Sequence, residues 1–278
     1  MAQRKTAMKF AVCNELFDGW DIERTIQTAA QIGFQAVEIA PYTLAPSVTE
    51  ISKQRRAEIR RMAQESGIEV AGLHWVLVGP QGLQINSPDA AVRHRTLDYL
   101  LSVVECCHDL GGKAIVFGSP NQRMVSPGLS CQQAWDYAKQ TLGEAAGGAE
   151  GTEVCIGLEP LAPKLTNFVN TAEEARRFVG EVNHPHLRIT LDCFSMSSES
   201  VPIPQIISAT RGYLCHFHAN DDNRREPGSG SLDFLPIARS LKEIEYPAYV
   251  SIEVFEFEKD PQAMAERGLK HLKGAFAA

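Results

Sequence analysis

Short β-like runs alternate with helix-like segments from one end of the chain to the other, and we count eight of each. The candidate strands lie near residues 9–14, 36–39, 70–75, 114–117, 154–159, 187–192, 214–220 and 249–253. Clear helix-like segments, with apolar residues at three- and four-residue spacing, include 22–32, 53–66, 92–110 and 171–182. No linker interrupts the series. The pattern predicts an α/β fold, a single (β/α)8 TIM barrel forming one domain over residues 1–278.

Glycines mark the ends of several predicted helices. Gly33, Gly67 and Gly111 each follow a helical pattern and precede a predicted strand, where a left-handed C-cap is expected. The stretch 220–233 is the most polar and glycine-containing connection, and it directly follows a candidate site residue at the end of the seventh strand. We therefore interpret it as a loop over a functional site.

Four ionisable side chains, Glu159, Asp192, His218 and Glu253, each stand at the carboxyl end of a predicted strand. The period of two places each of them on the face opposite the aliphatic side chains, which would pack on the helices. In a closed parallel barrel, all four would converge at the C-terminal rim, where such barrels place their active sites. The alternative is that each acid merely ends a strand and forms an ion pair or a helix cap.

This set of side chains is rich in oxygen ligands. Three carboxylates and one imidazole suit Mn²⁺, Mg²⁺ or Co²⁺ better than a thiolate-bound structural Zn²⁺. We expect one divalent metal ion, with Mn²⁺ preferred and Zn²⁺ disfavoured, and open coordination positions that hold a substrate.

The chain resembles the xylose-isomerase-like TIM-barrel superfamily of sugar isomerases and epimerases, and within it most closely the ketose 3-epimerases of the tagatose/psicose epimerase group. The order and spacing of Glu159, Asp192, His218 and Glu253 are the most specific part of the resemblance. The matching segments are Gly157-Leu158-Glu159-Pro160, Leu191-Asp192, His216-Phe217-His218, Ser251-Ile252-Glu253, Asn86-Ser87-Pro88-Asp89 with Arg93, and the stretches 110–112, 166–171 and 227–234.

The resemblance implies that those four side chains bind a divalent ion, which holds two neighbouring oxygens of a hydroxy-ketone. It also implies that Glu159 and Glu253 are catalytic, one removing the C3 proton and the other returning a proton to the opposite face of a metal-bound enediolate. Arg224 matches the family position that reaches substrate oxygens from the loop after the histidine. We therefore expect a metal-dependent isomerase or epimerase of carbohydrate metabolism.

Three further residues are expected at the substrate. The family commonly has a histidine three residues after the ligand aspartate, where this chain has Ser195, so this contact and the identity of the substrate are open. Glu38 and His74 end the second and third predicted strands and could touch substrate from the same rim. The alternatives are a rim carboxylate that is satisfied by backbone or water and a core histidine.

Charge and cysteine content restrict the partners and the compartment. With a formal net charge of −7 and a pI of about 5.7, the chain lacks the basic surface that nucleic-acid binding requires. No apolar stretch approaches the roughly 20 residues of a membrane span. Seven scattered cysteines without a CxxC spacing indicate reduced thiols in a cytoplasmic protein. We expect a small sugar or keto-polyol as the partner, and a homo-oligomer is compatible with the sequence.

Several other functions share parts of this pattern. An inosose dehydratase or an aldose–ketose isomerase of the hydroxypyruvate type begins with the same proton abstraction, so the sequence does not separate them from an epimerase. A non-catalytic sugar-binding barrel would not need two opposed glutamates. An endonuclease IV-like nuclease would need histidines that this chain lacks, one of them at Ser195.

Overall fold

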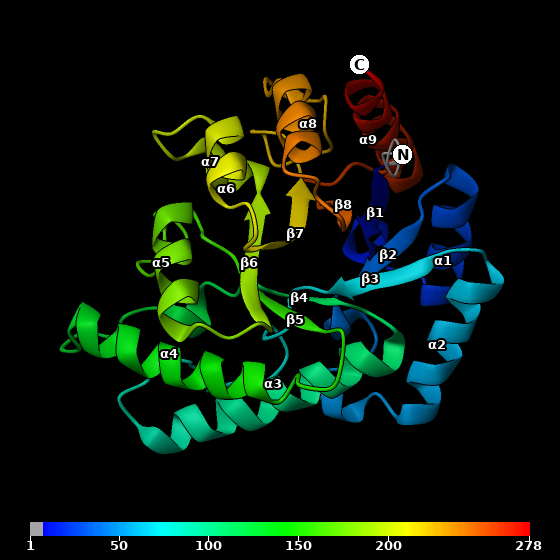
Figure 1. Cartoon of the computed structure of the whole chain (residues 1–278). Helices are drawn as coiled ribbons and strands as arrows, with labels where there is room; N and C mark the ends of the chain where they lie inside the picture. The colour runs from blue at the N-terminus through cyan, green and yellow to red at the C-terminus, as the bar shows by residue number, and fades with distance from the viewer. Residues whose placement is uncertain (1–7) are drawn as a thin grey trace, which may run out of the picture.

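Eight parallel strands close into one barrel in the computed structural model, which describes residues 8–278. Each strand pairs with the next along the chain, and β8 pairs with β1 to complete the ring (Figure 1). The strands are β1 (Lys9–Cys13), β2 (Ala36–Ile39), β3 (Glu69–Leu73), β4 (Ala114–Phe117), β5 (Cys155–Leu158), β6 (Leu187–Asp192), β7 (Leu214–Ala219) and β8 (Tyr249–Ile252). The predicted barrel is confirmed, and every predicted strand overlaps an observed one.

Helices connect the strands and surround the barrel (Figure 1). They are α1 (Ile22–Ile32), α2 (Lys53–Glu65), α3 (Ala90–Leu110), α4 (Cys131–Gly147), α5 (Ala172–Val182), α6 (Cys193–Ser197), α7 (Ile203–Ala209), α8 (Phe234–Glu243) and α9 (Pro261–Ala277). Two short helices, α6 and α7, occupy the connection after β6, where one had been expected. Pro202 lies between them, and a proline cannot donate the hydrogen bond that would continue α6 into α7.

The predicted helix ends at glycine are present. Gly33 and Gly111 follow α1 and α3 with φ of 100° and 84°, and their N–H groups donate to carbonyls of the last helical turn. This left-handed conformation is easy only for glycine, because it has no Cβ. Each glycine therefore ends a helix and turns the chain toward the next strand.

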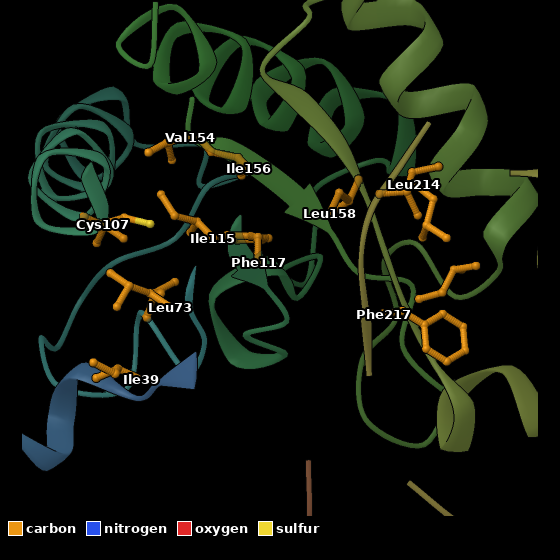
Figure 2. Packing of buried hydrophobic residues seen from close by; sticks show 14 of the residues in the cluster. Ile39, Leu73, Cys107, Ile115, Phe117, Val154, Ile156, Leu158, Leu214 and Phe217 are labelled. Carbon is orange, nitrogen blue, oxygen red and sulfur yellow. The ribbon is translucent and has the colours of Figure 1, made fainter. Parts of the chain in front are cut away.

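The outward faces of the strands form the main core. Ile156 and Leu158 of β5 and Phe217 of β7 are completely buried, and Figure 2 shows them among aliphatic side chains of neighbouring strands. Burying a side chain of this size contributes about 1.5–3 kcal/mol. The strand alternation predicted from the sequence therefore has a direct energetic basis, since a shift by one residue would turn these groups inward.

The inward faces carry small side chains near the start of the strands and polar ones near their ends. Ala11, Ala36 and Ala71 form a separate buried cluster inside the barrel. Gly157 is needed where β5 approaches β6, because a Cβ at this position would lie 2.2 Å from Thr190 Oγ1. Among residues 8–278, no helix combines the length and the apolar composition that crossing a membrane requires.

Candidate functional site

Four side chains from consecutive strands meet at the C-terminal rim. Glu159 directly follows β5, Asp192 ends β6, His218 lies near the end of β7 and Glu253 directly follows β8. Each offers one ligand atom, and these atoms all lie within 4.8 Å of one another. All four residues are buried, and their exposed fractions are 5%, 2%, 0% and 5% in that order. The barrel thus brings together the four residues that the sequence singled out.

Crowding three carboxylates into a buried space is electrostatically unfavourable. Burial raises the pKa of Glu159 well above its usual range, and the neighbouring Glu253 and Asp192 raise it further. Burial and Glu253 also raise the pKa of Asp192 to about 6. A divalent cation among these oxygens would reverse this effect, because its charge favours the ionised forms.

His218 directs its ring nitrogen Nδ1 toward this cluster. Its Nδ1 lies 2.9 Å from Glu253 Oε2, but the geometry does not make a hydrogen bond, and the buried atom has no hydrogen-bond partner among residues 8–278. A buried ring nitrogen without a hydrogen bond, beside three carboxylates, suits a metal ligand. The residues present therefore fit a divalent ion.

Glu38 lies below the cavity and does not form part of its wall. It is completely buried, and its two carboxylate oxygens lie 3.1 Å from His218 Nε2 and 2.7 Å from His216 Nε2. Burial alone would raise the pKa of Glu38, but the two histidines hold it well below its usual range. The expectation that Glu38 opens on the rim and touches substrate is therefore corrected. It holds the Nε2 side of His218 and leaves Nδ1 facing the carboxylates.

Asp192 is fixed through both oxygens. Oδ1 accepts a hydrogen bond of 2.7 Å from the Ser195 N–H at the start of α6, and Oδ2 accepts one of 2.5 Å from Asn220 Nδ2. Asn220 Oδ1 also accepts from the Phe194 N–H at 2.8 Å. The sequence reasoning missed Asn220, although it continues the inward spacing of His216 and His218. That spacing was the available signal.

A cavity of about 630 Å³, including space open to solvent, lies over the cluster. Polar groups enter it from several elements, whereas much of the wall is apolar. The polar lining residues are His74, Ser119, Glu159, Asp192, Ser195, Arg224 and Glu253, and the apolar ones include Trp75, Leu161, Leu165, Phe194 and Phe255. A mostly apolar cavity with few convergent polar groups is typical of a small-molecule site.

Three of the expected substrate residues, Arg224, Ser195 and His74, line this cavity. The guanidinium of Arg224 lies 4.7 Å from the ring centre of Phe255 and 5.5 Å from that of Phe194. Its buried Nε has no hydrogen-bond partner in the described part of the chain. It is therefore available to a substrate oxygen.

His74 is held from behind by a residue that the sequence reasoning did not find. Its Nε2 lies 2.5 Å from Glu15 Oε2, in the short 3-10 helix η1 (Asn14–Phe17) that follows β1. Burial opposes a charge on His74, but Cys13 and Glu15 raise its pKa well above the usual range. His74 is thus a fixed wall residue.

The sequence also gave no sign of Arg123, a buried cation behind Glu159. Arg123 ends the 3-10 helix η4 (Asn121–Arg123) and is completely buried. Burial lowers its pKa to about 10, against an opposing effect of Glu159, so it is charged at neutral pH. Arg123 and the Glu159 carbonyl that it contacts are 36 residues apart in the sequence, so no local pattern reveals this contact.

A family model described as xylose isomerase-like TIM barrel matches residues 26–275. D-psicose 3-epimerase of Ruminiclostridium cellulolyticum is 27% identical over 241 residues, which cover 84% of this chain and 78% of that protein. 3-dehydro-D-guloside 4-epimerase of Escherichia coli is 26% identical over 262 residues, covering 91% and 95%.

Solved structures agree in fold. A D-psicose 3-epimerase with D-tagatose from Clostridium cellulolyticum H10 has a TM-score of 0.86 and 23% identity, and covers 97% of this chain and 99% of that one. At this identity the likeness concerns the fold alone.

Proposed function

The chain belongs to the xylose isomerase-like TIM barrel family, and from this premise we propose that it is a metal-dependent sugar epimerase. In this proposal it inverts C3 of a ketose or keto-polyol. The observation that carries the proposal is the convergence of Glu159, Asp192, His218 and Glu253, whose ligand atoms lie within 4.8 Å of one another beneath a cavity. Sugar epimerases among the relatives support the reaction class.

The same four side chains would hold one divalent ion. We propose Mn²⁺, with Mg²⁺ or Co²⁺ as alternatives, because the set contains three carboxylates and no thiolate. When bound, the ion would polarise the carbonyl of the substrate and acidify the adjacent C–H group.

Glu159 and Glu253 then move the proton. They come from β5 and β8, with two strands between them on one side of the ring, so a substrate over the cluster has a carboxylate on each side. One glutamate takes the C3 proton, and the C–H electron pair passes into an enediolate. The other glutamate delivers a proton to the opposite face, which inverts the carbon, and for the other epimer the two exchange roles.

Arg224, His74 and Ser195 bind the substrate in this proposal. Arg224 offers its unpaired Nε to a substrate oxygen, and its guanidinium is kept in place by two aromatic rings. Ser195 has a short side chain where the family commonly has a histidine. The shorter side chain leaves more space in the cavity beside Asp192. This difference is expected to affect which sugar is accepted more than the proton transfer itself.

A second candidate is inversion at C4 of a 3-keto-glycoside. The 3-dehydro-D-guloside 4-epimerase of Escherichia coli supports it, because the match covers 95% of that protein, against 78% of the psicose epimerase. The chemistry is the same, since C4 of a 3-keto sugar also carries a C–H group next to a carbonyl.

NMR of candidate sugars incubated with Mn²⁺ and the enzyme in D₂O tests the reaction. Deuterium at C3 with inversion supports C3 epimerisation, and label at C4 of a 3-keto-glycoside supports the second candidate. Label confined to C1 or C2 would favour an aldose–ketose isomerase, and loss of water from an inosose would favour a dehydratase. Glu159→Gln and Glu253→Gln should each lower inversion by about 10²–10⁴-fold, because each removes a proton-transfer group.

A further inference from the structure

Arg123 is the largest completely buried side chain among the described residues. Its guanidinium donates from Nη1 to the Glu159 carbonyl oxygen at 2.6 Å, from Nε to the Ser119 carbonyl at 3.2 Å, and from Nη2 to the Phe117 carbonyl. No carboxylate within residues 8–278 lies in salt-bridge range of it. Burying a cation without a carboxylate partner is costly, and the hydrogen bonds to these three carbonyls offset part of that cost.

The three carbonyls lie where β4 and β5 end. Phe117 is the last residue of β4, and its oxygen also accepts the Glu159 N–H at 3.3 Å. Arg123 thus holds the backbone from which the Glu159 side chain extends. Arg123 is itself held, because Asn86 Nδ2 donates to its carbonyl oxygen at 2.6 Å.

The carboxylate of Glu159 is confined from another side as well. A Cβ added at Gly118 would lie 2.0 Å from Glu159 Oε2, so only glycine leaves room for this oxygen. Glu253 has no comparable arginine within the described residues. Its N–H donates to the Ala219 carbonyl at 3.4 Å, much as the Glu159 N–H donates to Phe117 at 3.3 Å, and its Oε2 lies 2.9 Å from His218 Nδ1. Of the two proposed proton-transfer groups, only Glu159 is therefore held by a buried arginine in the described part of the chain.

We propose that Arg123 is a positioning residue for Glu159. Arg123 fixes the end of β5 and thereby the position of the Glu159 carboxylate, whereas the position of Glu253 does not depend on Arg123. The inference rests on the proposed two-glutamate reaction. It predicts an asymmetric defect, because misplacing one of two opposed groups should impair the proton transfers on one face of the substrate only.

Deuterium uptake from D₂O at saturating Mn²⁺, followed separately for each epimer of an accepted substrate, measures this asymmetry. In Arg123→Lys and Arg123→Gln, inversion should fall by about 10- to 100-fold, as expected for a misplaced catalytic group. Exchange with retention should persist for the epimer whose proton goes to Glu253 and should fall for the other epimer. Equal loss of exchange for both epimers would overturn the proposal.

Arg56→Gln is the matched control. Arg56 is also buried, it donates to the backbone carbonyls of Ile51 and Val48 and pairs with Asp109, and it does not line the cavity. The Arg56→Gln variant should be less stable than the wild type but should not show the asymmetric exchange pattern. The same asymmetric pattern in Arg56→Gln would contradict the role of Arg123.

Gly118→Ala displaces the Glu159 carboxylate without touching Arg123. It should reproduce the asymmetric exchange pattern even if Arg123→Gln does not fold.

Calorimetric titration with Mn²⁺ gives a readout that does not need turnover. The Arg123 variants should bind Mn²⁺ about 10- to 100-fold more weakly, because Glu159 is also a proposed ligand, whereas Arg56→Gln should bind it as the wild type does. If the wild type exchanges no hydrogen with any sugar, the proposed reaction is wrong, and the titration alone decides the positioning role. Unchanged affinity in Arg123→Lys and Arg123→Gln would then exclude it.

Discussion

Glu38 illustrates how a side chain supports a site without reaching the substrate. Its two oxygens face His216 Nε2 and His218 Nε2, and it is completely buried. A carboxylate on one imidazole nitrogen fixes the ring and makes the other nitrogen a better metal ligand. Glu38 therefore acts on the proposed metal ion through His218.

Replacing Glu38 by Gln should weaken Mn²⁺ binding by about 10- to 100-fold, because the imidazole loses its charged partner. Titration of the metal-free protein would measure the change. Glu69→Gln is the control, since Glu69 bonds the Tyr249 hydroxyl at the far end of the barrel. Undiminished affinity in Glu38→Gln would show that His218 does not depend on Glu38.

The raised pKa of Asp192 predicts a pH dependence. Without metal, the folded chain holds this proton up to about pH 6, while the unfolded chain releases it near the ordinary value of 3.8. The folded state thus binds more protons in this window, and the stability that Asp192 contributes is lost as pH rises through about 6. Mn²⁺ affinity should change in the opposite sense and increase over the same range, because the metal needs the ionised form.

Thermal unfolding of the metal-free wild type and Asp192→Asn between about pH 4 and 7 would isolate this contribution. The difference in stability between the two proteins should change with pH in that window. A constant difference would rule out the raised pKa of Asp192.

At the scale of elements, the close approach of β5 and β6 depends on a missing side chain. Gly157 faces Thr190 inside the barrel, and these two strands carry Glu159 and Asp192 at their ends. A Cβ at Gly157 would force either the Thr190 side chain or the strand that carries it to shift. The spacing of two proposed ligands therefore depends on a glycine below them.

Gly157→Ala should destabilise the fold by about 1–3 kcal/mol, the usual cost of overpacking, and should weaken Mn²⁺ binding. Gly180→Ala is the matched control, because Gly180 lies exposed in α5 with no atom within 4 Å of an added Cβ. It should stabilise the helix by about 0.5–1 kcal/mol. Denaturant unfolding of both variants checks the contrast, which equal effects would refute.

At the scale of the whole molecule, the barrel gathers three carboxylates whose ionised forms a bound cation would stabilise. Mn²⁺ at 100 times its dissociation constant should raise the free energy of unfolding by about 2.7 kcal/mol. Asp192→Asn and His218→Ala should remain folded but should lose most of this increase and the activity together. Thermal scans with and without EDTA would measure it, and a wild-type response in both variants would disprove the ligand assignment.

The sequence by itself determined the eight strands, the approximate bounds of four helices (α1, α2, α3 and α5) and the phase of the inward-facing residues. Alternation along a strand is local, and parallel strands end at the same rim. The sequence could therefore place four side chains together at that rim: Glu159, Asp192, His218 and Glu253. The helix ends at Gly33 and Gly111 could be predicted for the same reason, because a left-handed cap makes its hydrogen bonds only to the last turn of its own helix.

Only the tertiary structure decided which side chains support the site. Glu38 contacts His216 from 178 residues away, and Arg123 contacts Glu159 from 36 residues away. Neither pairing leaves a periodic signal, because it depends on the register between strands and on closure of the ring. Strand phase shows that Glu38 points inward. Its depth in the barrel, which strand phase does not show, decides whether it contacts substrate or a histidine.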